Sequence, residues 1–148
     1  MMLPDSENAK VLLVEDNDLN RDMMQRRLAR RGYDVIVAVT ARDAIARARS
    51  ETPELILIDL RLPDMSGWEA AKLLKSDPAS LNIPLIALTA HAMEGDRERA
   101  MKAGCDEYEA KPIDLPRLLE KMQMLIERQR RLNLPSAPDS HAHPPPPP

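Results

Sequence analysis

Short apolar runs alternate along this chain with stretches in which apolar residues recur at helical spacing. Four runs have the length and apolarity of strands, and two of them, Leu55–Ile58 and Pro84–Leu88, are apolar throughout, which is typical of strands buried on both faces. The other two are Lys10–Val14 and Asp34–Val39. A fifth run, Glu107–Ala110, carries charges, as edge strands do. The chain is therefore expected to contain five strands.

A helix is expected after each of these strands. Thr40-x-x-Asp43 and Ser66-x-x-Glu69 resemble capping boxes, while Asp18 and Asp114 are candidate N-caps. A helix of low apolarity is expected over about 95–103, and the last helix has a continuous apolar stripe of Leu115, Leu118, Leu119, Met122, Leu125 and Ile126. Strands that alternate with helices predict an α/β fold, a doubly wound parallel sheet with right-handed crossovers and helices on both faces.

Polar residues follow four of the five strands. Glu15 and Asp16 follow the first, Asp59 the third, Thr89 the fourth and Lys111 the fifth. The carboxyl ends of parallel strands lie at one edge of the sheet, where open α/β folds bind their ligands. We therefore expect these side chains to converge on one site.

Carboxylates that share a cleft repel each other unless a positive charge lies among them. A hard divalent cation with oxygen ligands, Mg²⁺ in a cell, meets that requirement, and Lys111 adds a fixed charge. Such a site suits phosphoryl transfer, in which catalysis consists mainly of positioning and charge neutralisation. One of the carboxylates would act as the nucleophile.

At these same positions the sequence resembles a known family. VLLVEDN, LILIDLRLPDMSG, ALTAHA and EYEAKP are similar to the motifs of the CheY-like receiver domain of two-component response regulators. The resemblance covers about residues 10–126. The stretch ALTAHAMEGDRERAMKAGCDEYEAKPID is also similar to single-domain regulators of the DivK type and to receivers attached to hybrid kinases. It implies the (βα)5 flavodoxin/CheY-like fold with strand order 2-1-3-4-5.

The resemblance assigns a role to each polar residue at the strand ends. Asp59 would accept a phosphoryl group from a histidine. Asp16 would bind Mg²⁺ directly, Glu15 would bind it through water, and the backbone carbonyl of Arg61 would be a further ligand. The phosphoryl oxygens would be held by Thr89 and Lys111, whose movement would signal phosphorylation.

Three further positions take expectations from the family. Tyr108 matches the aromatic residue that turns inward on activation, and the Lys111–Pro112 bond is often cis in the family. Arg61 and His91 match the positions that flank the path of hydrolytic water. We hypothesise that these two bulky polar side chains obstruct that water and give a long-lived phosphoprotein.

Length and composition set the limits of this interpretation. The 148 residues fit one domain, with a flexible N-terminus over 1–9, a receiver domain over 10–130 and a disordered Pro-rich tail over 131–148. The net charge of −3 gives no general case for binding nucleic acid. Cys105 is the only cysteine, and no apolar run is long enough to span a membrane, so we expect a cytoplasmic protein.

Two readings within the receiver class stay open. One is a switch that is phosphorylated by a sensor histidine kinase and signals to a downstream protein through the fourth helix, last strand and last helix. The other is a relay intermediate that exchanges phosphate with a histidine phosphotransfer protein. In neither case is the chain expected to be an enzyme beyond its own phosphorylation and dephosphorylation.

Readings outside this class fit the residues less well. A haloacid-dehalogenase-like phosphatase needs a second Asp where Arg61 stands. A nucleotide site needs a glycine-rich loop, which is absent. A flavin site needs aromatic residues that sandwich the ring, and nothing in this sequence supplies them. A scaffold that has lost the phosphorylation chemistry is disfavoured because every expected acid, hydroxyl and lysine is present.

Overall fold

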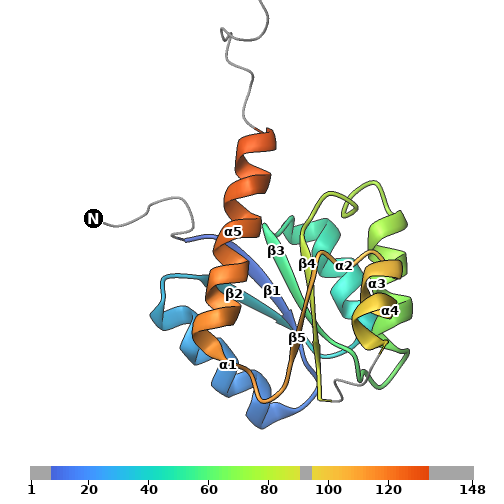
Figure 1. Cartoon of the computed structure of the whole chain (residues 1–148), viewed down its shortest axis with the longest axis horizontal. Coiled ribbons are helices and arrows are strands. Elements are labelled where there is room, and N and C mark those ends of the chain that lie inside the picture. Colours follow the sequence, from blue (N-terminus) through green and yellow to red (C-terminus); the bar gives the residue numbers. More distant parts are fainter. Residues whose placement is uncertain (1–7, 91–94, 134–148) are drawn as a thin grey trace, which may run out of the picture.

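The computed structural model describes residues 8–90 and 95–133, which contain a five-stranded parallel sheet (Figure 1). The strand order is β2-β1-β3-β4-β5, which confirms the order 2-1-3-4-5 and the α/β doubly wound fold. The strands are β1 (Lys10–Val14), β2 (Asp34–Ala38), β3 (Leu55–Asp59), β4 (Leu85–Thr89) and β5 (Glu107–Ala110). All adjacent pairs are parallel, so all five strands end at the same edge.

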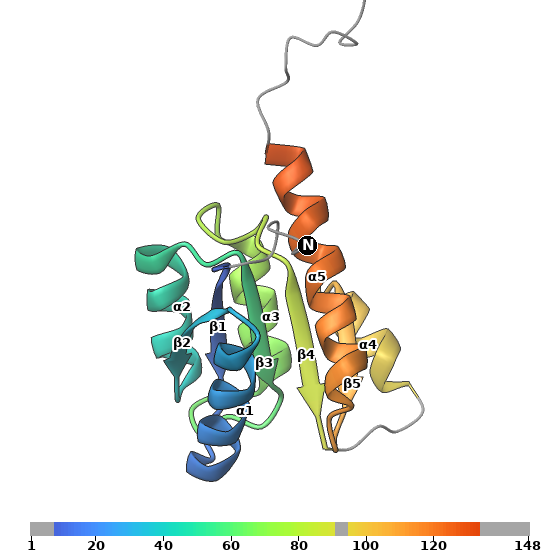
Figure 2. The ribbon, with the colours of Figure 1, turned by 90° about the vertical axis from the view of Figure 1, so that its left-hand side faces the viewer.

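Five helices cover the two faces of the sheet in this part of the chain. They are α1 (Asp18–Arg30), α2 (Ala41–Glu51), α3 (Gly67–Ser76), α4 (Asp96–Lys102) and α5 (Leu115–Asn133). Helices α1 and α5 lie on one face, and α2, α3 and α4 lie on the other (Figures 1 and 2). The sheet is thus the middle layer of three.

The sheet separates two apolar cores. One core joins alternate residues of β1, β3 and β4 to small side chains of α2, α3 and α4, of which Ala44, Ala71 and Ala100 are fully buried. The other joins the remaining strand residues to α1 and α5, where Leu28, Leu118 and Met122 are fully buried. Every residue of β3 and β4 is buried, because these strands are covered on both faces.

Three of the four N-caps expected from the sequence are confirmed. Thr40 Oγ1, Ser66 Oγ and Asp114 Oδ1 accept hydrogen bonds from backbone N–H groups three residues on, at 3.0, 3.2 and 3.1 Å. The expected cap Asp18 is instead the first residue of α1. Its neighbour Asn17 has the extended backbone that an N-cap needs, and Asn17 Oδ1 accepts from the N–H of Asn20 at 2.9 Å.

The last helix continues beyond the expected end of the folded region. Residues 131–133, which composition assigns to the tail, are the last residues of α5, and Figure 1 shows this end projecting past the sheet. The sequence around Leu132 contains no helix breaker before Pro135, and a proline disfavours helical backbone in the residue that precedes it. The rest of the tail, 134–148, and most of the N-terminal segment, 1–7, lie outside the described residues.

Within the part of the chain that is described, no helix has both the length and the apolarity that a membrane span requires.

Candidate phosphorylation site

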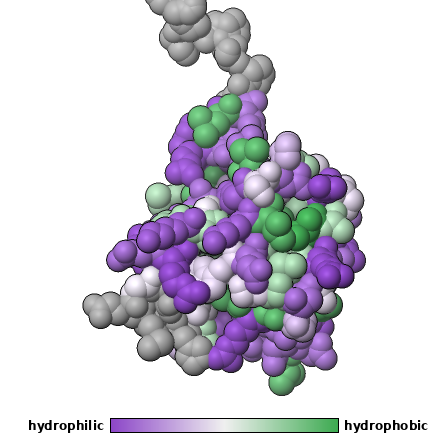
Figure 3. Space-filling view, turned by 90° about the vertical axis from the view of Figure 1, so that its right-hand side faces the viewer, coloured by the Kyte–Doolittle hydropathy of each residue, from purple (hydrophilic) through white to green (hydrophobic). Residues whose placement is uncertain are grey.

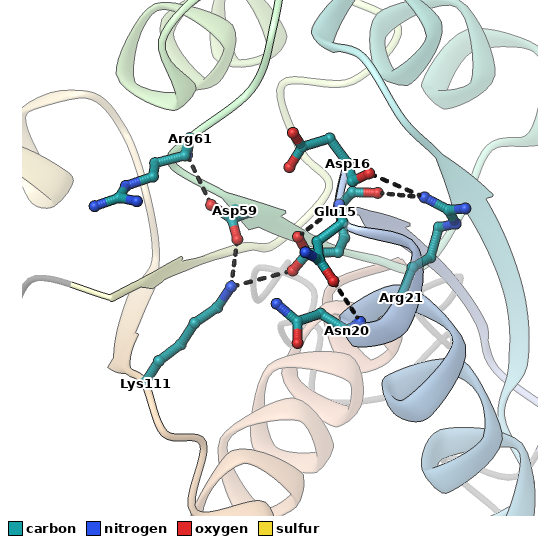
Figure 4. A network of polar contacts seen from close by, with 8 residues as sticks. Glu15, Asp16, Asn20, Arg21, Asp59, Arg61 and Lys111 are labelled. Atoms are coloured by element: carbon teal, nitrogen blue, oxygen red, sulfur yellow. Dashed lines mark hydrogen bonds and ion pairs between the residues drawn. The ribbon is translucent and has the colours of Figure 1, made fainter.

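Asp59 is the last residue of the central strand β3, and its carboxylate is nearly enclosed. The side chain is 7% exposed. Asp59 Oδ1 accepts a hydrogen bond from the backbone N–H of Arg61 at 2.7 Å, and Oδ2 is paired with the Lys111 ammonium (Figure 4). Two donors therefore fix the orientation of this carboxylate.

Lys111 lies directly after β5 and extends across the strand ends to two acids. Its Nζ lies 3.1 Å from Glu15 Oε1 and also contacts Asp59 Oδ2. Burial alone would lower the pKa of the Lys111 ammonium, but its hydrogen bonds to Asp59 and Glu15 and their charges outweigh burial and raise that pKa. Lys111 is therefore held in its charged form between two carboxylates.

Glu15 is buried at the end of β1, whereas Asp16 beside it is exposed. Burial and the neighbouring charge of Asp59 raise the pKa of the Glu15 carboxyl, and Lys111 opposes that rise. The N–H of Asn17 donates to Glu15 Oε2 at 3.2 Å. A guanidinium nitrogen of Arg21 donates to the carbonyls of Glu15 and Asp16 at 3.1 and 3.4 Å, which holds the loop that carries both acids.

These groups line one cleft of about 520 Å³ at the carboxyl edge of the sheet. Its walls are Glu15, Asp16, Asn17, Asp18, Asn20, Asp59, Arg61, Ala90 and Lys111. No three His, Cys, Asp or Glu side chains of the described segments form a ready-made metal cluster. Mg²⁺ nevertheless usually binds through only one or two carboxylates and keeps several waters. The carboxylates that line this cleft supply oxygen ligands for such a cation. The repulsion between Asp59 and Glu15, which raises the pKa of Glu15, would be relieved by its positive charge.

The other site residues expected from the sequence lie at or near this edge. Thr89 ends β4, the strand next to β3, and is 6% exposed. Tyr108 is partly buried and packs against the core under α4. Arg61 is exposed, and Figure 4 shows its side chain directed away from Asp59. His91 lies outside the described residues. The Lys111–Pro112 bond is cis, as the family resemblance implies.

Three residues that support this site were not identified from the sequence. The N–H of Asn17 and the guanidinium of Arg21 support the loop of Glu15 and Asp16, and Asp64 contacts the start of α2. Arg21 occurs in an arginine-rich helix, and such runs of charge are usually solvated faces, so its sequence context gave no signal. Asp64 lies in the motif LRLPDMSG, where a polar loop residue is unremarkable.

Comparisons with known proteins agree with this geometry. Residues 11–123 match the response regulator receiver domain family. The chain is 42% identical over 116 residues to the polar-differentiation response regulator DivK of Brucella ovis, an alignment that covers 78% of this chain and 94% of that protein.

Solved structures show the same fold. The receiver domain of a sensor histidine kinase from Pseudomonas aeruginosa is 34% identical, with a TM-score of 0.75 over 80% of this chain and 98% of that one. That structure has a magnesium ion coordinated in the active site cleft. The chemotaxis response regulator CheY4 of Vibrio cholerae is 28% identical, with a TM-score of 0.73 over 79% of this chain and 98% of that one. With its family motifs, fold and relatives in agreement, this chain belongs to the receiver domains of two-component response regulators.

Proposed function

We propose that the chain is a phosphorylation-controlled switch in which Asp59 accepts a phosphoryl group from a phosphohistidine. The observation that carries the proposal is the position of Asp59: a nearly enclosed carboxylate at the end of the central strand, oriented by Lys111 and by the N–H of Arg61. The donor would be a sensor histidine kinase or a histidine phosphotransfer protein. A kinase that uses ATP would place this reaction in the cytoplasm.

The transfer requires no acid or base beyond the two partners. A carboxylate oxygen of Asp59 attacks the phosphorus, the N–P bond of phosphohistidine breaks, and the bonding electrons return to the imidazole nitrogen. The product is an aspartyl phosphate, an acyl phosphate that carries one more negative charge than the carboxylate. Lys111 already contacts Asp59, so its ammonium is placed to neutralise that added charge.

In this proposal Asp16, Asp59 and the backbone carbonyl of Arg61 hold Mg²⁺ directly, and Glu15 holds it through water. The ion supplies positive charge that offsets the charge on the transferring phosphoryl oxygens. Asp16 is exposed to the cleft and Asp59 is fixed by two donors, so one ligand can adjust while the other stays in place.

The signal would leave the site through Thr89, Lys111 and Tyr108. Thr89 and Lys111 would each bind a phosphoryl oxygen, and Tyr108 would respond to the movement of Thr89. The output surface would be the face of α4, β5 and α5, where Met101 and Met124 are 37% and 65% exposed. Figure 3 shows the side of the molecule that carries α3 and α4, where apolar patches lie among hydrophilic side chains.

Incubation with a small-molecule phosphodonor and Mg²⁺, followed by intact mass measurement, tests the phosphoacceptor role. Wild type is expected to gain one phosphate, and Asp59→Asn none. A wild type that stays unlabelled where a control receiver is labelled would support a scaffold that lacks the chemistry. We expect no turnover of other phosphate esters, since the proposed reaction ends with the protein's own dephosphorylation.

A relay role is the second candidate, because the likeness to a kinase receiver domain favours it. It is distinguished by following phosphate in both directions. A terminal switch would accept phosphate from a histidine protein without returning it, whereas a relay intermediate would pass it on to a histidine phosphotransfer protein.

A further inference from the structure

The loop between β3 and α3 carries both the N–H and the carbonyl of Arg61, and it is closed tightly at its base. The N–H of Gly67 donates to the carbonyl of Leu60 at 3.0 Å, and Arg61 and Ser66 form an antiparallel bridge. A Cβ on Gly67 would lie 2.5 Å from Leu60 Cα and 2.9 Å from the carbonyl oxygen of Asp59. The base of this loop is therefore packed directly against the strand end that carries Asp59.

The tip of the same loop is attached to a different part of the molecule. Asp64 Oδ1 accepts from the N–H of Ala41 at 2.8 Å, and Oδ2 accepts from the N–H of Arg42 at 3.0 Å. These are the first two N–H groups of α2, which have no partner within the helix. Thr40 satisfies the third, that of Asp43, at 3.0 Å. The negative charge of Asp64 is also favourable at a helix N-terminus.

The start of α2 is in turn connected to the acids of β1. Strand β2 leads into α2, and its last residue, Ala38, is paired with Val14 of β1. The carbonyl of Ala38 accepts from the N–H of Glu15 at 3.0 Å. The segment 38–42 thus contacts Glu15 on one side and Asp64 on the other, and it links the two loops that line the cleft.

We propose that Asp64 is a positioning residue for the phosphorylation site: by binding the N-terminus of α2 it holds the Arg61 backbone at a fixed distance from the two acids that follow β1. The inference rests on the proposed function, because it concerns the geometry of the metal and phosphoryl site. Asp64 touches neither group itself and acts through the loop.

Loss of Asp64 should weaken the site because both Mg²⁺ and Asp59 depend on the position of the Arg61 backbone. Mg²⁺ requires nearly ideal octahedral geometry with short ligand distances, so a ligand on a loose loop binds it poorly. The Arg61 N–H also orients Asp59 Oδ1. Without Asp64 the loop loses its attachment at the tip, and this loss also loosens the hydrogen bonds at its base, so the Arg61 carbonyl can move away from Asp16.

The test compares Asp64→Ala with Thr40→Ala, two variants that each remove an N-terminal partner of α2. Both are expected to lower the midpoint of thermal unfolding by a similar amount, because each removes a hydrogen-bond partner from the N-terminus of the same helix. Only Asp64→Ala also detaches the β3–α3 loop. Asp64→Asn keeps one acceptor oxygen but loses the charge, so its effects should be intermediate.

Two readouts are measured at a temperature at which all variants are folded. Titration calorimetry with Mg²⁺ alone should show affinity about 10-fold lower in Asp64→Ala, the size expected when a supporting residue of a metal site is lost, and unchanged in Thr40→Ala. Amide hydrogen exchange should be faster at Arg61 and Gly67 in Asp64→Ala only. The Mg²⁺ concentration for half-maximal labelling by a phosphodonor should rise similarly, with the rate at saturating Mg²⁺ largely retained.

The outcomes separate this inference from the proposed function. If wild type is labelled at Asp59 but Asp64→Ala matches Thr40→Ala in Mg²⁺ affinity and in exchange, Asp64 is only a helix cap and the inference is wrong. If wild type neither binds Mg²⁺ nor becomes labelled, the proposed function itself fails.

Discussion

Two carboxylates, Glu15 and Asp59, share one ammonium in the cleft, and this arrangement sets the behaviour of individual residues there. The ammonium of Lys111 occupies space beside the Asp59 oxygen and adds positive charge where the account places a divalent cation. Lys111 therefore has two opposing effects. In the proposed mechanism it would repel the metal before phosphorylation and would bind the phosphoryl group afterwards.

Lys111→Met should bind Mg²⁺ several-fold more tightly than wild type but accept phosphate more slowly. Removal of a like charge from a partly buried site favours the cation, whereas loss of a phosphoryl partner disfavours the transfer. Calorimetric titration and the labelling rate measure the two effects. Lys121→Met is the control, because Lys121 is similarly enclosed but pairs with Glu109 away from the cleft. Weaker Mg²⁺ binding in Lys111→Met would contradict the argument.

We expect Arg61 and His91 to affect how long the phosphoryl group stays on Asp59. Arg61→Ala, His91→Ala and the double variant should each lose phosphate faster than wild type, with the double variant fastest, because smaller side chains leave the path of attacking water open. The Arg61 side chain is directed away from Asp59, so it must turn toward the phosphoryl group to act (Figure 4). Loss of label over time measures the effect, and equal lifetimes in all four proteins would exclude it.

At the scale of elements, the strand ends and the loops that follow them determine the site. The β3–α3 loop is held at its base by Gly67 and at its tip by Asp64. Backbone contacts this close leave no room for a side chain at Gly67. The glycine thus has a steric role beside the phosphoacceptor.

Gly67→Ala should lower the free energy of unfolding by about 1–3 kcal/mol, as overpacked substitutions do, and should also slow labelling because it displaces the end of β3. Gly104→Ala is the matched control. Gly104 has φ +99° and a Cβ there would meet the flexible Lys75 side chain, so alanine is also strained, but at the opposite edge of the sheet. Chemical denaturation and the labelling rate separate the two variants; normal labelling in a folded Gly67→Ala would show that the loop base does not matter.

Element positions were largely predictable, and the exceptions have physical causes. The strands β3 and β4 were clear because burial on both faces leaves only apolar residues. The cap of α1 was misplaced by one residue because Asn17 and Asp18 are both good cap formers, and only the backbone conformation distinguishes them. Helix α5 extends three residues past the change in composition at 131, because no helix breaker occurs before Pro135.

At the scale of the whole molecule, a parallel sheet brings residues far apart in the chain to one edge. This property of parallel sheets is the reason that the sequence alone predicts one site for Glu15, Asp59, Thr89 and Lys111. Lys111 lies 96 residues from Glu15 along the chain. Which of these groups pair, and how Asp64 reaches α2, depends on loop conformations that no residue pattern specifies. Topology therefore predicts the members of the site, whereas the structure is needed for their contacts.

The central claim is that the phosphoryl group resides on Asp59, and chemical trapping tests it most directly. Borohydride reduces an aspartyl phosphate to homoserine, so reduction of the phosphorylated protein followed by peptide sequencing locates the modified residue. Homoserine is expected at position 59 in wild type incubated with phosphodonor and Mg²⁺, and none when Mg²⁺ is chelated. Homoserine at position 16 instead, or a labelled protein with no homoserine, would contradict it.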